Sequence, residues 1–237
     1  YGGHFISLMN RLADDEFWSE NKIVYLPNEI KRMKDAEYIS ELFIGMIGGI
    51  QERKQEQIDN YYKLYDEKFP DREEKRKEFE AIERLIEEIF GEDLVKTKWH
   101  GKADFYSLLH AIYELSKNYY FSPERYEEVK KHLKDFGSKV DKSIRQSEEK
   151  EKKEGVEDPL VHDYIENVEK QTTHKATRQR RYEIVRQLLI PFLIAKDTRR
   201  EFNDEERRIA WDMSKDKKCA ICNKTVEWND YQLDHKK

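Results

Sequence analysis

The sequence predicts an all-α protein built as a multi-helix bundle. Charged residues make up 40% of the 237 residues and apolar residues 37%, which is typical of long helices with one solvated face. Only nine glycines and five prolines interrupt the chain. Apolar residues also recur every three or four positions through most of it, which is the spacing of one face of an α-helix. We therefore expect roughly seven to nine amphipathic helices, with enough apolar residues to form a sizeable core.

The opening segment predicts two helices joined by an extended link. Residues 1–16 begin with a Gly-Gly turn and continue as a helix. The apolar side chains of that helix's inner face are Phe5, Leu8, Met9 and Leu12. Residues 23–26 predict a short strand or extended link closed by Pro27. Residues 31–49 predict a strongly apolar helix, which the Gly48-Gly49 pair ends.

Four more amphipathic helices are expected before the middle of the chain ends. Their ranges are 51–69, 71–91, 103–118 and 122–144. Pro70, Gly91 and the Ser122-Pro123 pair provide the breaks between them. The tyrosines of the first of these helices lie at helical spacing, so we expect them in the core rather than stacked on bases. We expect His110 to be a packed imidazole rather than a metal ligand.

A run of charged residues of both signs, 145–158, divides the predicted chain. Such a run is typical of a solvated helix end or a flexible link, and we interpret it as the principal hinge. The sequence thus predicts a helical bundle over residues 1–150 and a basic helical connector over 151–212, which begins with a helix at Asp158-Pro159. Residues 213–237 form a third, separate segment.

The connector contains the strongly basic stretch of the chain. Between residues 170 and 200 stand nine lysines and arginines and two acidic residues, although the whole chain has a net charge of −5. Apolar residues give this stretch one inner face, so its basic side chains are expected on the opposite face, where they would contact phosphates of DNA. The candidate nucleic-acid residues are Lys175, Arg178, Arg180, Arg181 and Arg186. RNA remains open as the nucleic acid, and so does a solvated face that pairs with acidic helices upstream.

The last segment contains residue types that bind metals. A short helix is expected over 202–213, with Phe202, Ile209 and Trp211 facing inward, and it is followed by a C-x-x-C pair. Two thiolates at that spacing can bind one tetrahedral Zn²⁺, and Cys219 and Cys222 are the candidates. Asp234 and His235 follow a short β-prone run. A carboxylate beside an imidazole suits phosphodiester hydrolysis with Mg²⁺ or Mn²⁺.

Three other interpretations of the C-x-x-C segment stay open. The spacing from Cys222 to His235 also occurs in a C2H2 finger, but Val226 and Gln232 stand where that motif has its apolar anchors. A purely structural zinc ribbon is the second alternative. A redox dithiol is the third, although no βαβ pattern surrounds the pair.

The letters C-A-I-C followed by L-D-H resemble the opening of an HNH (ββα-metal) endonuclease. The resemblance implies that His235 is the general base and that Asp234 helps to hold the catalytic divalent ion. It also implies that Cys219 and Cys222 are half of a structural zinc site. The family's second C-x-x-C, its Asn and its final His would follow Lys237. We therefore expect the chain to be a fragment that ends in a C-terminal stub of the ββα-metal zinc-knuckle domain.

The opening also resembles a family. Y-G-G-x-F-x-x-L and then K-R-M-K-D-A-E before an apolar helix are similar to the helical part of GmrSD-type N-terminal domains, and D-T-R-R-E-F-N-D-E-E-R is similar to the segment before the HNH module. This family consists of restriction and phage-defence proteins. The resemblance implies a DNA endonuclease, inactive as this fragment alone, whose nucleotide-handling half would precede Tyr1.

The composition sets further expectations about partners and location. The longest apolar run, 188–195, contains Pro191 and is far too short to span a bilayer, so no membrane partner is expected. The two cysteines both lie in the C-x-x-C pair, which predicts no disulfide framework and a cytoplasmic protein. A homo-oligomer is left open. The competing function is a non-catalytic helical coupling module with a structural zinc ribbon that grips nucleic acid.

Overall fold

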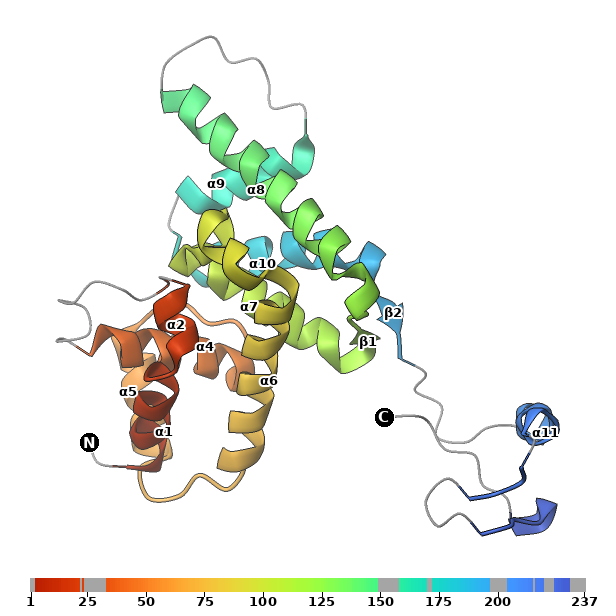
Figure 1. Cartoon of the computed structure of the whole chain (residues 1–237). Coiled ribbons are helices and arrows are strands. Elements are labelled where there is room, and N and C mark those ends of the chain that lie inside the picture. The colour runs from red at the N-terminus through yellow and green to blue at the C-terminus, as the bar shows by residue number, and fades with distance from the viewer. Residues whose placement is uncertain are drawn as a thin grey trace. The chain divides into compact units, whose positions relative to one another are not determined.

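The computed structural model describes residues 3–21, 23, 33–148, 158–169, 172–196, 204–214, 216–219 and 224–230. The chain divides into two compact units (Figure 1). We call them the helical unit, residues 1–195, and the C-terminal unit, residues 196–237. Ten α-helices lie within the described residues, so the predicted all-α class is confirmed at this level.

The helical unit begins with α1 (His4–Ala13), which packs on α4 (Lys34–Gly48). The four predicted inner residues of α1 are all buried, and Phe5 is the centre of an aromatic cluster. Its ring neighbours are Phe43, Tyr61, Tyr62, Tyr65 and Phe69. The three tyrosines come from α5 (Gln55–Leu64) and the residue after it, so they pack on the core as predicted.

A short second helix, α2 (Glu16–Glu20), was not predicted. Asp15 starts it, because its side chain accepts a hydrogen bond from the Phe17 amide at 2.9 Å. Phe17 and Trp18 on this helix are both buried. The expected extended link at 23–26 lies largely outside the described residues, since only Ile23 is described.

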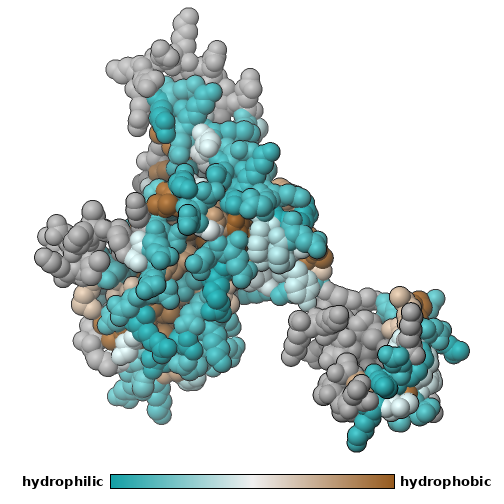
Figure 2. All heavy atoms as spheres, in the orientation of Figure 1, coloured by the Kyte–Doolittle hydropathy of each residue, from teal (hydrophilic) through white to brown (hydrophobic). Residues whose placement is uncertain are grey.

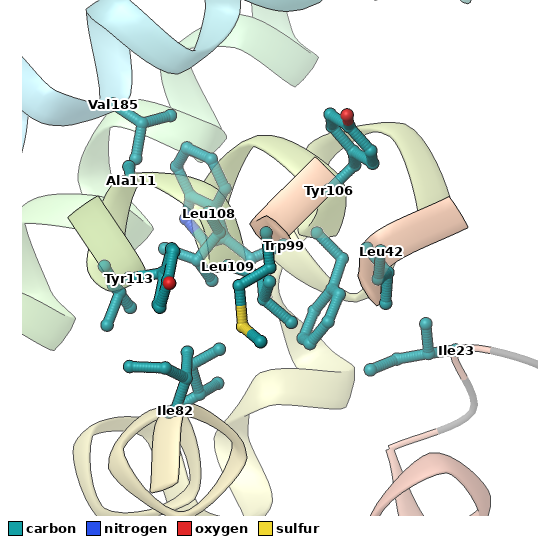
Figure 3. Close-up of a cluster of buried hydrophobic side chains, with 14 of the residues drawn as sticks. Ile23, Leu42, Ile82, Trp99, Tyr106, Leu108, Leu109, Ala111, Tyr113 and Val185 are labelled. Carbon is teal, nitrogen blue, oxygen red and sulfur yellow. The ribbon is translucent and has the colours of Figure 1, made fainter. Parts of the chain in front are cut away.

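The middle of the helical unit is α7 (Lys102–Asn118), which is buried along most of its length. It packs against α4, α6 (Arg72–Phe90) and α10 (Lys175–Leu189) (Figure 1). Figure 3 shows part of the resulting cluster, in which labelled residues of α7 lie beside labelled residues of these three helices. The labelled residues of α7 are Tyr106, Leu108, Leu109, Ala111 and Tyr113, and their partners include Leu42, Ile82 and Val185.

Short elements connect the long helices. Gly91, with φ of +52°, ends α6 as predicted, and the 3-10 segments Gly91–Lys96 and Lys98–His100 lead into α7. After α7 comes β1 (Tyr119–Tyr120), then a 3-10 turn at Pro123–Arg125, and then α8 (Tyr126–Glu148). After α10, a 3-10 turn at Ile190–Phe192 leads to β2 (Ile194–Ala195), which pairs antiparallel with β1.

The predicted domain boundary at residue 150 differs from the observed one. The helix α9 (Pro159–Glu169) packs on α8 and α10, and α10 packs on α7. Ile184, Val185 and Leu189 of α10 are fully buried in the same core as α7. The connector therefore belongs to the helical unit up to Ala195. The charge run suggested a boundary, but the helices on both sides of it carry apolar faces that pack into one core. Residues 149–157 of the run lie outside the described residues.

The C-terminal unit contains α11 (Asp204–Met213), an antiparallel bridge between Lys218 and Thr225, and a 3-10 turn at Trp228–Asp230. The rings of Trp211 and Trp228 meet edge to face with centroids 5.7 Å apart. Trp211 thus packs inward as predicted, whereas Ile209 does not, because 54% of it is exposed. Phe202 lies outside the described residues.

The surface of the described residues is mostly polar. Figure 2 shows hydrophilic side chains over most of the visible face, with hydrophobic ones in small patches. In the part of the chain that the structure describes, every helix is too short or too polar to cross a membrane.

Candidate functional site

Arg181 is one of the five predicted nucleic-acid residues, and it is completely buried. Its guanidinium donates to the carbonyl oxygens of Asn167 at 2.7 Å and of Thr172 at 2.8 Å. Asn167 lies in the last turn of α9, whose carbonyls have no partner within the helix, so a cation is favourable there. Burial lowers the pKa of Arg181 from its ordinary value. Arg181 therefore holds the end of α9 against α10 and α7.

Arg178 is also inside the helical unit, with 4% of it exposed. It forms an ion pair with Glu41 of α4 and donates to the carbonyl of Gln51 at 3.1 Å. Its guanidinium also lies over the ring of Tyr106 on α7, 4.3 Å from the ring centroid. One side chain of α10 therefore ties α4, the loop after α4, and α7 together.

The prediction that the basic residues line a solvent face is consequently wrong for Arg178 and Arg181. The sequence contains the reason. These two arginines continue the inner stripe of Val185 and Leu188, at spacings of three and four residues along α10. A positive charge suggests an exposed side chain. The exposure of Arg178 and Arg181 is instead set by their position on the buried face of α10.

The other three candidates lie nearer to solvent. Lys175 is exposed at the start of α10. Arg180 donates to Asp163 of α9 at 2.7 Å and to Glu183 at 3.2 Å, and these bonds raise the pKa of Arg180. The guanidinium of Arg186 lies 5.7 Å from the ring of Tyr182. Arg180 therefore pairs with acidic groups, as the alternative interpretation of the basic stretch expected. Phosphate contact by Lys175, Arg180 and Arg186 stays a prediction.

The C-x-x-C segment is described as far as Cys219. Its amide donates to the carbonyl of Lys224 at 2.8 Å, and the Val226 amide donates to the carbonyl of Lys217 at 2.8 Å. With the bridge between Lys218 and Thr225, these bonds pair residues 217–219 with residues 224–226 as the two arms of a short hairpin. Cys219 is half-buried.

The other predicted ligands, Cys222, Asp234 and His235, lie outside the described residues. Within the residues that are described, no group of three or more His, Cys, Asp or Glu side chains is close enough to hold a metal ion. The structure therefore describes the backbone at Cys219, which is one of the four predicted metal-site residues. The geometry of the other three stays a prediction.

The hairpin is attached to α11 by aromatic and cationic side chains. Lys217 donates to the Trp211 carbonyl and lies 4.6 Å from the Trp211 ring centroid. Arg207 and Arg208 lie 5.5 Å and 5.9 Å from the centroid of the Trp228 ring. These contacts join α11, the hairpin and the following turn into one small unit.

Sequence reasoning missed a polar cluster between α4, α7 and α10. The Nδ1 atom of His110 bonds to the Tyr106 carbonyl at 2.6 Å, and the two rings stack 4.1 Å apart. Burial lowers the pKa of His110 to about 4, so its imidazole is neutral. Its Nε2 is buried without a partner, and a Cβ added at Gly45 would lie 2.1 Å from it. His110 is therefore packed as predicted, with one nitrogen bonded.

A surface depression adjoins this cluster, and Glu41 and Arg178 are among the residues that line it. Arg53 and Glu41 are 3.2 Å apart, and Lys54 and Glu52 are 2.7 Å apart, so the charges around the depression pair with one another. These ion pairs hold α4, α10 and the loop after α4 together. Three of the charged lining residues are basic and two are acidic, which leaves one positive charge in excess.

Comparison of the chain with protein-family models, curated proteins and solved structures finds no match.

Proposed function

We propose that the protein carrying this chain is a metal-dependent HNH DNA endonuclease of restriction or phage defence. One observation supports the proposal, namely that residues 217–219 and residues 224–226 pair as the two arms of a short antiparallel hairpin, with Cys219 in the first arm and Cys222 between the arms in sequence. A C-x-x-C between two antiparallel arms would bring both thiolates onto one metal ion, as structural zinc sites require. The sequence then continues into the Asp234-His235 pair that resembles the HNH motif.

The proposed roles follow the sequence motif. Cys219 and Cys222 would hold a structural Zn²⁺ that stiffens the hairpin. His235 would take the proton from the attacking water, and Asp234 would hold a Mg²⁺ or Mn²⁺ ion. That ion would supply charge stabilisation at the leaving oxygen.

The burial of Arg178 and Arg181 reduces the number of residues that we propose for DNA contact. Arg178 and Arg181 are excluded from it, because both guanidinium groups are buried and bonded to partners inside the helical unit. Lys175, Arg180 and Arg186 remain the candidate phosphate contacts on α10. Phosphate contact by Arg180 would compete with its bonds to Asp163 and Glu183.

The function is tested by plasmid cleavage with the protein that carries this chain, in the presence of Mg²⁺ or Mn²⁺ and with and without nucleotide. His235→Ala should abolish cleavage and leave DNA binding unchanged, since the general base is lost and the phosphate contacts remain. His174→Ala is the matched control, because His174 is exposed just before α10 and far in sequence from the motif. Cleavage that survives in the His235 variant contradicts the assignment.

A second candidate function is a helical coupling module that does no chemistry, in which the C-terminal unit serves as a zinc ribbon. The observation that favours it is the use of the basic helix as an internal strut, with Arg178 and Arg181 joining α4, α7, α9 and α10. In this case neither the His235 variant nor the wild type cuts DNA.

A further inference from the structure

Glu83 is a carboxyl group buried inside the helical unit. It lies on α6, 5% of it is exposed, and its Oε1 is buried without a hydrogen-bond partner. An ionised carboxylate in such a place has lost its water and gains little in exchange, and this strongly disfavours the charged form. Glu83 is an acidic side chain on the inner face of an otherwise apolar contact, between Ile82 and Ile86 in sequence.

The groups around Glu83 add to this effect. Asp15 lies in the turn between α1 and α2, and its side chain is held in place there because it accepts from the Phe17 amide. Glu80 of α6 is held by Arg76 at 2.5 Å. The charges of Asp15 and Glu80 both oppose ionisation of Glu83, while Arg84 and a hydrogen bond from Trp18 favour it more weakly.

The segment that acts on Glu83 from outside α6 is the start of α2, since Asp15 and Trp18 both influence its ionisation. Trp18 is buried, donates its indole N–H to the Leu12 carbonyl at 3.0 Å, and lies 6.2 Å from the ring of Phe79 on α6. The helix α2 has only five residues, so its own hydrogen bonds hold it weakly, and docking on its neighbours keeps it in place.

We propose that Glu83 is a proton-operated switch, whose neutral form keeps α2 docked on α6 and whose ionisation loosens that contact. Ionisation would place a second carboxylate beside Asp15 in a site with little water. The result would be repulsion between α6 and the α1–α2 turn. The neighbouring helices are held by other residues, so the change should be local.

The direction of the pH dependence follows from linkage. Burial, and after it the charges of Asp15 and Glu80, raises the pKa of Glu83 well above its ordinary value. The folded state therefore holds its proton more tightly than the unfolded state. This stabilisation is complete below the ordinary glutamate pKa and is lost as the pH rises through the pKa of the folded state.

The test compares unfolding by urea in the wild type and in Glu83→Gln, between about pH 4 and about pH 9. Glutamine has the same shape and cannot ionise. The ratio of the two unfolding constants should rise about tenfold per pH unit above the ordinary pKa of glutamate and then level off. Glu87→Gln, on the exposed side of the same helix, should leave the ratio constant. A constant ratio for Glu83→Gln, or an equal rise for Glu87→Gln, contradicts the switch.

A local readout separates a switch from a general loss of stability. Hydrogen exchange of the amides in residues 14–21 should be faster in the wild type than in Glu83→Gln at high pH and equal at low pH, while the amides of α7 exchange equally throughout. If glutamine prevents folding, Glu83→Met keeps the volume and must show the same loss of pH dependence. Equal exchange of residues 14–21 in both proteins at high pH also overturns the proposal.

Discussion

At the scale of single residues, the chemistry of a side chain is decided by its place on the helix. Arg180 and Arg181 are neighbours in sequence, yet Arg180 is partly exposed and Arg181 is fully buried. The exposed one forms ion pairs of small net value, because water already solvates both partners. The buried one supplies hydrogen bonds to carbonyls that would otherwise have no partner.

This contrast predicts very different effects of two adjacent substitutions. Arg181→Ala should destabilise the protein by about 3 kcal/mol, since it leaves two carbonyls without donors and opens a space in the core. Arg180→Ala should cost less than about 1 kcal/mol. Urea unfolding of both variants measures the difference. Equal losses of stability would show that burial does not determine the role of these arginines.

At the scale of elements, α10 shows what the sequence could and could not predict. Its helical character and its apolar residues were readable from periodicity. The inward position of Arg178 and Arg181 was readable too, from their spacing to Val185 and Leu188, but the positive charges suggested a surface. Their partners could not be foreseen, because Glu41 and Asn167 come from other helices and no local rule relates them to α10.

The short helix α2 and the cluster at His110 illustrate the same limit. Asp15 is a local signal for a helix start. The apolar periodicity of residues 1–16 continues past it, and this periodicity predicts one helix where the structure has two. The close approach of His110 to Gly45 depends on the packing of α7 on α4. A pairwise contact of this kind is set by the tertiary structure alone. The C-x-x-C motif that contains Cys219 could be recognised in the sequence. The pairing of residues 217–219 with 224–226 could not be predicted from it.

The packing of α9 and α10 predicts where the chain can be cut. Residues 1–195 alone should fold cooperatively, with the same melting temperature as the helical unit has in the whole chain, because this range is one compact unit. Residues 1–150 alone should not fold stably, because Ile184, Val185 and Leu189 would be missing from the core around α7.

Circular dichroism at increasing temperature distinguishes the two truncated chains. A cooperative transition in residues 1–150 at the temperature seen for residues 1–195 would contradict the observed boundary and restore the predicted one at residue 150.

At the scale of the whole molecule, we infer that the helical unit and the C-terminal unit have different roles. The helical unit pairs most of its buried charges internally, with Glu41 and Arg178 as one such pair, which suits a rigid support. The C-terminal unit is small, and the arms of its hairpin flank the C-x-x-C for which we propose a zinc ion. A unit of this size has little apolar core, and a structural metal is the usual compensation. The proposed nuclease depends on that metal.

Zinc content therefore tests the central claim most directly. The protein that carries this chain, purified without added metal, should contain about one structural zinc ion per polypeptide. Cys219→Ser should lose that zinc together with DNA cleavage, whereas Thr177→Ala on α10 should keep both. A wild-type protein that contains no zinc, or a Cys219 variant that retains zinc and cuts DNA as the wild type does, would contradict the account.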